Sequence, residues 1–321
     1  MRVLVHQHPA SGAGLLEHLV VGELGHEAML ARREDAHRGG AVRPPFAYFG
    51  GKTGMADRLV ALLPPHRVYM EPFFGSGAVL FAKRPSTHEI VNDLDDAVVA
   101  FFRCLRERPE DLERACRLTP YARAEYQASD LDGPLDDLER ARRFWVRVNQ
   151  SFAKTAGRAT GWSVTTARTQ STGGSVEGRI DRFMACARRL STVAIEHCDA
   201  AGLVERLATP DTAIYVDPPY LFSTRNSRAK TSGASDYRCD MGAEDKHARL
   251  AEVLHQTAAA VVLSGYPSPL YDDLYGDWPT IDVHVHAHSS NAVTSGRGQR
   301  VERIWTNFEP HVGRLALGAS S

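Results

Sequence analysis

Apolar and polar residues follow two periods along the chain, and these periods predict strands that alternate with helices. Short apolar runs typical of buried strands lie at 68–70 and 88–93, and a run with helical spacing follows each of them. After residue 107 the alternation stops, and it resumes near residue 192 with further strand-like runs: TVAIEHCD, AIYVDPPY, AAVVLSGY, TIDVHVHAH and RIWTNF. We therefore expect an α/β fold in which crossover helices connect the strands of a parallel sheet, interrupted by one inserted region.

The same patterns divide the chain into five parts. Residues 1–42 are predicted to be an extension with a linker rich in charge, Gly and Pro, and residues 43–107 the first part of the sheet domain. Residues 108–190 are predicted to be the insertion, which is mainly helical and contains the polar run TAGRATGWSVTTARTQSTGGS. The sheet domain continues at 191–310, and residues 311–321 form a C-terminal tail.

The total charge of the chain hides a local excess of basic residues. The formal net charge is −1 and the sequence pI is about 6.9. Between Arg140 and Arg189, however, eleven Lys and Arg side chains accompany only two acids, so this stretch carries +9. A concentrated basic stretch is typical of a surface that binds nucleic acid.

The cysteines and the apolar runs exclude several classes of protein. The five cysteines are widely spaced and form no C-x-x-C pair, which favours reduced thiols over a disulfide framework or a zinc site. No apolar run approaches the ~18 residues of a membrane span, and the N-terminal sequence lacks the pattern of a signal peptide. We therefore expect a cytoplasmic protein that does not act on a membrane.

The stretch FGGKTG at 49–54 looks like the second half of a phosphate-binding loop. That loop requires G-x-x-x-x-G-K-S/T, and its first glycine would fall on Phe46. Pro44 and Pro45 also stand where a buried strand should run. The stretch is therefore not predicted to bind a triphosphate, and Lys52 lies instead in a turn that precedes a helix.

A second glycine turn, EPFFGSG at 71–77, follows a predicted strand directly. Glycines there let a ligand approach the backbone, and ligands gather at the carboxyl ends of parallel strands. The next strand ends at Asp93, about twenty residues on, where a carboxylate can accept hydrogen bonds from the two ribose hydroxyls of a nucleoside. Asp93 could equally cap the helix that begins near Ala97, so both interpretations stay open.

The strongest chemical pattern is YVDPPY at 215–220, in which an apolar strand ends in Asp217, Pro218, Pro219 and Tyr220. The prolines stiffen the loop and bring no N–H groups that would compete for its carbonyl oxygens. A carboxylate and a carbonyl can together accept both protons of an exocyclic amine, while the tyrosine ring stacks on the base that carries it. The alternative is a strand that ends in prolines next to a structural Asp.

Six segments, in their order and spacing, resemble one enzyme family. FAYFGGK, MEPFFGSGAV, IVNDLD, YVDPPY, VVLSGYPSPLYDDL and VERIWTNF are similar to segments of the Dam-type, or D12-class, adenine-specific DNA N6-methyltransferases, and the resemblance covers residues 43–310. EPFFGSG and DPPY are specific in combination. The resemblance implies a Rossmann-like sheet that binds S-adenosylmethionine, with an inserted target-recognition region before the DPPY motif. The basic stretch falls in that region.

The resemblance also implies roles for particular residues. The loop Asp217, Pro218, Pro219 and Tyr220 would be catalytic and would grip an adenine that has been flipped out of the duplex. The residues implied in binding S-adenosylmethionine are Tyr48, Lys52, Glu71, Pro72, Phe73, Gly75, Gly77, Asp93, Asp199 and Asp217. The residues expected to contact DNA phosphates are Arg140, Arg143, Arg147, Lys154 and Arg158, with Arg142 in the same group.

The sequence therefore predicts an enzyme that acts as a monomer on double-stranded DNA and methylates N6 of adenine, with a cognate restriction nuclease as a candidate partner. An RNA or N4-cytosine methyltransferase would use the same DPPY loop, and a non-catalytic DNA-binding module could retain the fold. Arg143 and Arg147 share one helix face and could equally form a solvated surface. His284, His286 and His288 share one face of a strand, but without a carboxylate companion we predict no metal site.

Overall fold

The computed structural model describes residues 41–48, 50–151, 161–163, 172–221, 239, 241, 243–286 and 299–310. The chain divides into two units, Met1–Gly39 and Gly40–Ser321. The first unit lies outside the described residues, so everything below concerns the second. Three residues named in the sequence analysis also lie outside the described residues: Lys154, Arg158 and His288. The same holds for most of the polar run TAGRATGWSVTTARTQSTGGS.

Seven strands of the described part form one sheet, in the order β3-β2-β1-β4-β5-β7-β6. The strands are β1 (Val68–Glu71), β2 (His88–Asn92), β3 (Val193–Glu196), β4 (Thr212–Val216), β5 (Ala260–Gly265), β6 (Thr280–His286) and β7 (Gln299–Thr306). Neighbouring strands from β3 to β5 are parallel, whereas β7 runs antiparallel to both β5 and β6. The predicted α/β fold with a parallel sheet is confirmed, and the antiparallel strand is an addition to it.

Successive residues of the strands point to opposite faces of the sheet and enter two separate apolar cores. On β4, Ala213 and Tyr215 belong to one core, while Ile214 and Val216 belong to the other. The inner parts of β1, β2 and β5 alternate in the same way. Because both faces are buried, these strands appear in the sequence as continuous apolar runs rather than as alternating ones.

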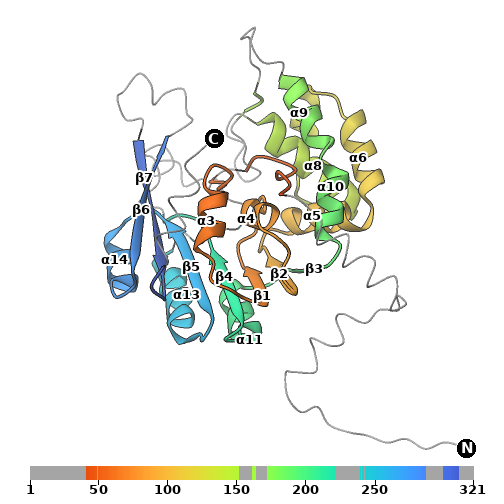
Figure 1. Ribbon diagram of the computed structural model, residues 1–321. Helices are drawn as coiled ribbons and strands as arrows, with labels where there is room; N and C mark the ends of the chain where they lie inside the picture. The colour runs from red at the N-terminus through yellow and green to blue at the C-terminus, as the bar shows by residue number, and fades with distance from the viewer. Residues whose placement is uncertain are drawn as a thin grey trace, which may run out of the picture. The chain divides into compact units, whose positions relative to one another are not determined.

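Helices cover both faces of the sheet (Figure 1). On one face lie α3 (Ala56–Leu62), α4 (Ala78–Ala82) and α5 (Asp96–Glu107), whose apolar residues form the first core with Tyr215. On the other face lie α11 (Ala200–Leu207), α13 (Glu244–Gln256) and α14 (Pro269–Tyr275), which form the second core with Ile214. The sheet is thus the middle layer of three.

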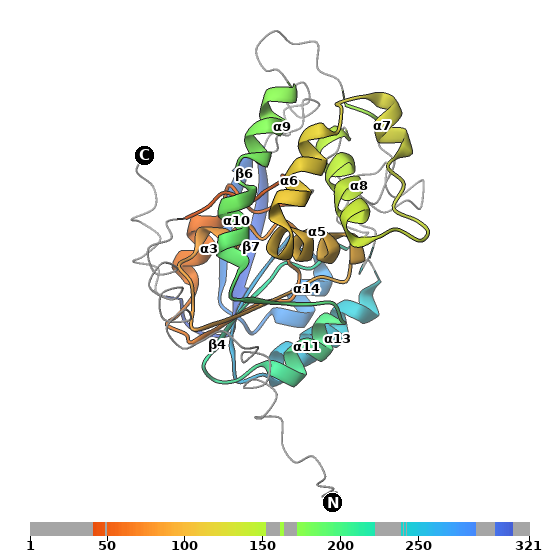
Figure 2. The ribbon, with the colours of Figure 1, turned by 90° about the vertical axis from the view of Figure 1, so that its right-hand side faces the viewer.

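The insertion adds a group of helices next to α5 (Figures 1 and 2). These helices are α6 (Pro109–Leu118), α7 (Arg123–Ala128), α8 (Asp137–Gln150), α9 (Thr172–Ile180) and α10 (Phe183–Leu190). The ring of Phe101 on α5 lies 5.8 Å from that of Phe144 on α8 and 5.7 Å from that of Phe183 on α10, between centroids. The prediction of a mainly helical insertion is confirmed, and the insertion packs on the first core instead of forming a core of its own.

The strand order reverses between β1 and β4, because β2 and β3 continue the sheet on one side of this pair and β5 continues it on the other. In open α/β sheets, ligands bind outside the carboxyl ends of the strands at such a reversal. The loops that follow β1, β2 and β4 are therefore the first place to look for a site.

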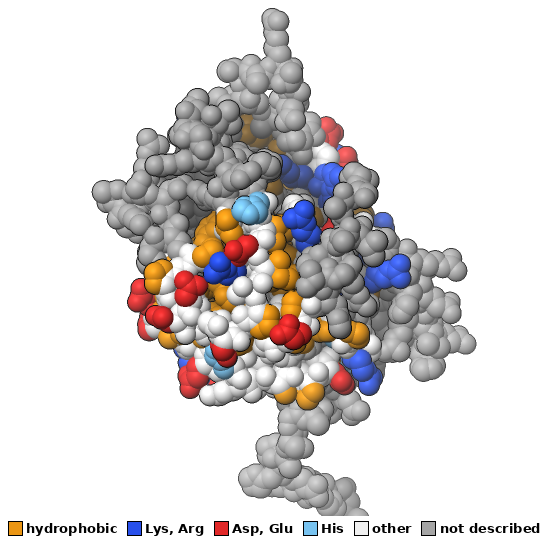
Figure 3. Space-filling model, turned by 60° about the vertical axis from the view of Figure 1, so that its left-hand side comes forward, with side chains coloured by type: hydrophobic (Ala, Val, Ile, Leu, Met, Phe, Trp, Pro, Cys, Tyr) orange, Lys and Arg blue, Asp and Glu red, His pale blue; other side chains and the backbone are white. Residues whose placement is uncertain are grey.

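The side of the molecule that carries β6, β7 and α14 comes forward in Figure 3. Acidic and basic side chains lie next to each other there, around apolar ones. Arg303 on β7 forms ion pairs with Asp282 at 2.7 Å and with Asp272 at 3.4 Å. The charge of Arg303 on this side is thus balanced by acids of the protein itself. No helix in the described part of the chain is both long and apolar enough to span a bilayer.

Candidate active site

A pocket of about 360 Å³ opens at the reversal of strand order. Its walls come from the turn before α3, from the loops that follow β1, β2, β3 and β4, and from the start of α13. The volume lies in the range of sites that bind small molecules. Segments that are distant in sequence therefore meet around one cavity, at the place that the topology indicates.

The glycine turn after β1 forms one wall of this pocket from bare backbone. Gly75 (φ 48°) and Gly77 (φ 69°) both adopt positive φ, which L side chains rarely do. Space is limiting as well, because a Cβ on Gly77 would lie 2.6 Å from the ring of Phe74 and one on Gly75 would lie 3.3 Å from the ring of Tyr48. The turn therefore requires glycine at both positions, and a ligand can approach the backbone at Gly75.

Asp93 ties this turn to the end of β2. Its Oδ2 accepts a hydrogen bond from the backbone N–H of Gly75 at 2.9 Å, and its Oδ1 accepts one from the N–H of Asp95 at 3.0 Å. The cap of α5 is Asp95, whose side chain accepts from the N–H of Ala97. The interpretation of Asp93 as a helix cap is therefore wrong. Burial, with the charge of Asp95 as the second cause, raises the pKa of Asp93 to about 6.

A buried cluster of charges lies where the turn before α3 meets the loop after β4. Lys52 Nζ donates to both carboxylate oxygens of Asp217, at 2.8 and 2.9 Å, and to the hydroxyl of Tyr220 at 2.6 Å. It also lies 3.0 Å from the carbonyl oxygen of Gly50 and 3.2 Å from Oε1 of Glu302. Burial lowers the pKa of Lys52, but the charges of Asp217 and Glu302 raise it well above its ordinary value. Lys52 therefore stays positively charged.

Asp217 is the most exposed of the three charged side chains in this cluster. Its side chain is 19% exposed, compared with 5% for Lys52 and 4% for Glu302. Ser264 on β5 donates to Asp217 Oδ1 at 3.2 Å, and Tyr215 forms a hydrogen bond with Ser264 in turn. Burial raises the pKa of Asp217, while Lys52 opposes the rise. The carboxylate is thus held from behind and open toward the pocket.

Glu71, another acid that lines the pocket, differs from Asp217 in its surroundings and in its protonation. It is buried at the end of β1, where the hydroxyl of Tyr69 donates to its Oε2 at 2.9 Å. Burial raises the pKa of Glu71 to about 8, although the hydrogen bond from Tyr69 lowers it. At neutral pH Glu71 is therefore mostly protonated and can donate a hydrogen bond as well as accept one.

Tyr220 forms an aromatic pair with Tyr266, a residue of the loop after β5. The ring centroids are 4.4 Å apart and the ring planes differ by 34°. The hydroxyl of Tyr220 donates to Glu302 at 3.1 Å and accepts from Lys52. The hydroxyl end of Tyr220 is thus anchored in the charge cluster.

Sequence reasoning missed three residues that contact Lys52, Asp217 or Tyr220. They are Glu302, Ser264 and Tyr266. They lie in VVLSGYPSPLYDDL and VERIWTNF, which contribute to the family resemblance but carried no assigned chemistry. One signal was available for Glu302. It is the lone acid of β7 and stands two residues before the buried Ile304, so the alternation of the strand places both side chains on the same face.

The pocket collects most of the residues that the sequence analysis assigned to it. The predicted residues that line it are Tyr48, Lys52, Glu71, Pro72, Phe73, Gly75, Asp93, Asp199, Asp217 and Pro219. Gly77 lies in the same turn as Gly75, and Pro218 and Tyr220 lie in the same loop as Asp217. Asp199 has a structural part as well, because its Oδ2 accepts from the N–H of Gly202 at 2.9 Å and caps α11. The roles of these residues toward a ligand stay predictions.

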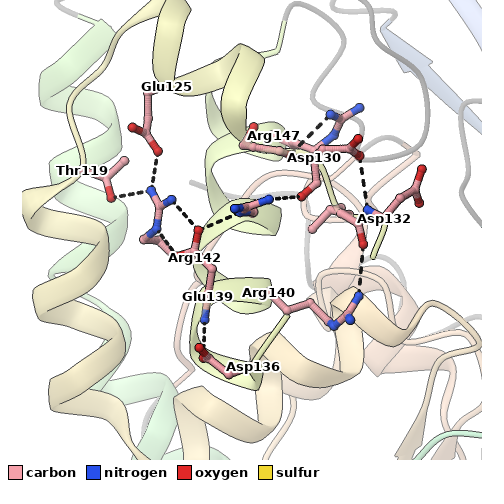
Figure 4. A network of polar contacts seen from close by, with 12 residues as sticks. Thr119, Glu125, Asp130, Asp132, Asp136, Glu139, Arg140, Arg142 and Arg147 are labelled. Atoms are coloured by element: carbon pink, nitrogen blue, oxygen red, sulfur yellow. Dashed lines mark hydrogen bonds and ion pairs between the residues drawn. The ribbon is translucent and has the colours of Figure 1, made fainter. Parts of the chain in front are cut away.

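Acids of the protein itself hold the arginines at the centre of α8 (Figure 4). Arg142 forms ion pairs with Glu139 of the same helix and with Glu125 of α7. Arg143 pairs with Glu139 as well, at 2.6 Å. Hydrogen bonds from Arg142 lower the pKa of Glu139 to about 2, although burial raises it. The guanidinium group of Arg142 therefore links α8 to α7, whereas that of Arg143 pairs within α8.

The two outer arginines of α8 also contact the protein. Arg140 forms an ion pair with Asp96 of α5 at 2.8 Å, and Arg147 donates to the carbonyl oxygen of Ser129 at 3.5 Å. A phosphate contact by any α8 arginine would have to compete with these partners. Whether the arginines contact DNA stays a prediction.

The acids that neutralise α8 precede the stretch that carries the excess of basic residues. Glu125 and Glu139 lie before Arg140, and Asp96 lies further upstream on α5. The charge of +9 between Arg140 and Arg189 therefore overstates the positive charge that α8 offers to a partner.

Cysteine and histidine chemistry has little support in the described part. All five cysteines are free; Cys104, Cys116 and Cys186 are buried. Among the described residues, no group of three or more His, Cys, Asp or Glu could hold a metal ion. His284 is exposed on β6, and the side chains of the other two histidines of the predicted triplet are not described.

One family model matches most of the chain, and one curated methyltransferase resembles the chain over nearly its whole length. The family model of the D12 class N6 adenine-specific DNA methyltransferases matches residues 48–291. The chain is 25% identical over 283 residues to the Type II methyltransferase M1.LlaDCHI of Lactococcus lactis subsp. cremoris, and the match covers 83% of this chain and 96% of that protein.

Solved methyltransferase structures also resemble this chain. They include a putative methyltransferase, yhhF, of Escherichia coli, with 10% identity, a TM-score of 0.29 and coverage of 79% of this chain and 80% of that one. An rRNA methylase of Streptococcus thermophilus has 7% identity, a TM-score of 0.33 and coverage of 81% and 98%.

The matched range contains the glycine turn, Asp93 and the DPPY loop, which the fold brings to one pocket of a Rossmann-like methyltransferase sheet. The match decides among the chemistries that the DPPY loop alone left open, and it favours adenine in DNA over RNA or N4 of cytosine. It also favours a transferase over a binding module. The chain belongs to the D12 class of N6 adenine-specific DNA methyltransferases.

Proposed function

We propose that the methyl donor of this enzyme is S-adenosylmethionine, and that it binds in the pocket between Lys52, the glycine turn and Asp93. The observation that supports this most is one cavity that contains both Asp93 and Asp217. A nucleoside-binding carboxylate and an amine-binding carboxylate then face the same space.

The residues present fit such a donor. The carboxylate of Asp93 uses one hydrogen bond on each oxygen within the protein, and a carboxylate has about four acceptor sites, so it retains capacity for two ribose hydroxyls. The bare backbone at Gly75 allows close approach of a ligand. Glu71, which is protonated at neutral pH, can donate to the carboxylate of the donor's methionine part without repelling it.

The transfer requires little chemistry from the protein beyond positioning. S-adenosylmethionine supplies a methyl group on a positively charged sulfur, and a new N–C bond forms as the S–C bond breaks and its electron pair passes to sulfur. Asp217 and the carbonyl oxygen of Pro218 accept hydrogen bonds from the N6 amine, which turns the nitrogen lone pair out of the ring system. Holding the reacting groups in line provides most of the rate enhancement.

Asp217 also fits the role of proton acceptor. Once the methyl group is bound, N6 is positively charged and has to release one proton. The nearest base is the Asp217 carboxylate. Burial raises the pKa of Asp217, which makes it a stronger base than an exposed Asp. The proton then leaves toward solvent, since the side chain is 19% exposed.

The target adenine has to leave the stack of double-stranded DNA before its amine can reach Asp217, and flipping costs a few kcal/mol. We expect the flipped base to stack on the ring of Tyr220, which pairs with the ring of Tyr266. The enzyme acts as a monomer on DNA, and the helical insertion contacts the duplex beside the target.

Incubation of the purified protein with isotopically labelled S-adenosylmethionine and unmethylated duplex DNA, followed by mass spectrometry of the nucleosides, tests this function. We expect labelled N6-methyladenine. Label on cytosine, or label on RNA alone, would contradict the proposed substrate. N6-methyladenine that forms without the label would contradict the proposed donor.

We propose, in addition, that the enzyme protects DNA from a cognate restriction nuclease, because M1.LlaDCHI is named a Type II methyltransferase. Expression of the enzyme should then make host DNA resistant to one restriction specificity. Digestion of that DNA with a panel of nucleases, each of known specificity, tests this.

A further inference from the structure

Glu302 is a buried acid that lies behind the DPPY loop. It sits on β7 opposite Val283 of β6, with 3% of its surface exposed. Its Oε1 lies 3.2 Å from Lys52 Nζ and accepts a hydrogen bond from the hydroxyl of Tyr220 at 3.1 Å. Glu302 is not among the residues that line the pocket. Any effect it has on the reaction therefore passes through Lys52 or Tyr220.

The ammonium of Lys52 has more acceptors than protons. Its three N–H groups face five oxygen atoms: both oxygens of Asp217, the hydroxyl of Tyr220, the carbonyl of Gly50 and Oε1 of Glu302. The contacts to Asp217 and Tyr220 are the shortest, and the contact to Glu302 is the longest. Lys52 can therefore give up one acceptor for another by a small movement, without losing a hydrogen bond.

The present arrangement leaves Asp217 poorly prepared for an incoming amine. Lys52 occupies one acceptor site on each of its oxygens, and Ser264 occupies a further site on Oδ1. An exocyclic amine can donate to the acceptor site that remains on Oδ2, but there it competes with a full positive charge for the electron density of the same carboxylate. That competition is relieved if the ammonium finds another carboxylate nearby.

Glu302 is the described residue that meets this need. Lys52 forms ion pairs with Asp217 and with Glu302. Glu71 is a poor alternative because it is mostly protonated at neutral pH and bonded to Tyr69. A buried charge without a partner would be strongly unfavourable. A second carboxylate next to Lys52 keeps the charge of Lys52 compensated while Asp217 binds the amine of the substrate.

We propose that Glu302 is a positioning residue that receives the ammonium of Lys52 when the target amine engages Asp217. This inference rests on the proposed function of Asp217. Lys52 then moves from a pair dominated by Asp217 to a pair dominated by Glu302, and the hydroxyl of Tyr220, bonded to both Lys52 and Glu302, stays in place during the exchange.

The test is a double-mutant cycle of Glu302→Gln and Lys52→Met, with single-turnover rates measured on the DNA sequence that the wild type methylates. The glutamine side chain keeps the shape and an acceptor for Tyr220 but loses the charge. We expect Glu302→Gln to lower the rate about 10- to 100-fold in the wild-type background, the size expected for a charged hydrogen bond. In the Lys52→Met background, where no ammonium has to move, the same change should alter the rate less than about threefold.

Donor binding, measured by calorimetry without DNA, separates positioning from damage to the pocket. We expect the Kd of S-adenosylmethionine to change less than about threefold in Glu302→Gln, since Glu302 does not line the pocket. Asp282→Asn on the neighbouring strand β6 is the matched control, because its carboxylate pairs with the surface residue Arg303. It should leave both the rate and the Kd unchanged.

Two results would overturn the proposal. One is a Glu302→Gln rate within about threefold of wild type. The other is an equal loss of rate in both backgrounds, which would mean that Glu302 acts by holding Tyr220 or by stabilising the fold. If Glu302→Gln does not fold, Glu302→Asp carries the same cycle with a smaller loss, because it retains the charge but shortens the reach to Lys52. The proposed function fails separately, if the wild type itself transfers no methyl group to adenine.

Discussion

The charge cluster of the pocket and the arginines of α8 both combine basic side chains with acids, but they differ in what the pairs leave open. In the pocket, Lys52 is buried and Asp217 remains partly exposed, so the cluster presents a carboxylate to the cavity. On α8, Arg142 and Arg143 converge on Glu139 of the same helix, and Arg142 also pairs with Glu125 of α7. One cluster is arranged around a space for a ligand, and the other fills the space between its own elements.

The difference shows that charge counted along the sequence does not tell where charge is available. The pocket gathers residues that lie 165 positions apart, which no local count detects. The α8 arginines look unbalanced when counted from Arg140 onward, yet Glu139 is the immediately preceding residue. Convergence on a cavity is therefore a better indicator of function in this protein than the local density of charge.

The largest effect is expected for Asp217→Ala. Loss of the carboxylate removes the acceptor of the N6 amine, and we expect the methylation rate to fall at least about 100-fold, about 2.7 kcal/mol in the activation barrier. Thermal unfolding should still be cooperative, because Lys52 keeps Glu302 as a partner. A rate above about a tenth of wild type would remove Asp217 from its assigned role.

Arg142→Ala should act on stability instead of chemistry. The change leaves Glu139 and Glu125 without their shared guanidinium, and we expect the free energy of unfolding to fall by about 2 kcal/mol in chemical denaturation. Arg114→Ala, at an exposed position of α6, is the control and should change it by less than about 0.5 kcal/mol.

Methylation at a temperature where Arg142→Ala is folded sharpens the comparison. We expect a rate within about threefold of wild type at saturating DNA, because the guanidinium is occupied within the protein. A loss of binding to DNA that is largest at low salt and shrinks as salt rises, without a loss of stability, would instead mark Arg142 as a phosphate contact.

Donor binding should weaken at acidic pH because of Asp93. Its pKa of about 6 means that the carboxylate is ionised at about pH 7.5 and protonated at about pH 5, and the protonated form is a poorer acceptor for ribose hydroxyls. We expect the Kd of S-adenosylmethionine, measured by calorimetry, to rise about tenfold over this range. Asp93→Asn should bind weakly at both pH values; a pH dependence that survives in this variant would point to another group.

The smallest effect is expected for Glu139→Gln, through the pH dependence of stability. The folded-state pKa of Glu139 is about 2, which is below its ordinary value. Its ionised form therefore stabilises the fold at every pH above its ordinary pKa. That contribution is lost as the pH falls toward about 2. The stability difference between wild type and Glu139→Gln, from denaturation at several pH values, should therefore shrink between about pH 5 and about pH 2. A constant difference would mean that the ion pairs contribute nothing.

The sequence predicted the sheet well because its strands depend on local patterns. Apolar runs identified β1, β2 and β4, and the motifs at their ends contain Gly75, Asp93 and Asp217 at positions that the strands fix. The resemblance to the D12 family then supplied the chemistry. The cap of α5 was less accessible, since Asp93 and Asp95 are both acids near the helix start and only backbone geometry shows which one caps it.

Other features depend on pairing across the fold, which no local pattern contains. Glu302 joins Lys52 through the antiparallel strand β7, and its position follows from the register with β5 and β6. The partner of Arg140 is Asp96 on another helix. Both contacts arise from tertiary packing, so sequence periodicity could indicate burial of Glu302 but could not name the partner in either contact.

A crystal structure of the protein with bound S-adenosylhomocysteine, the product of the methyl donor, would test the central claim most directly. We predict that the nucleoside occupies the pocket at the reversal of strand order, with its ribose hydroxyls on the Asp93 carboxylate and its sulfur on the side of Asp217. A ligand bound outside this pocket, or one that makes no contact with Asp93, would contradict the assignment of the site.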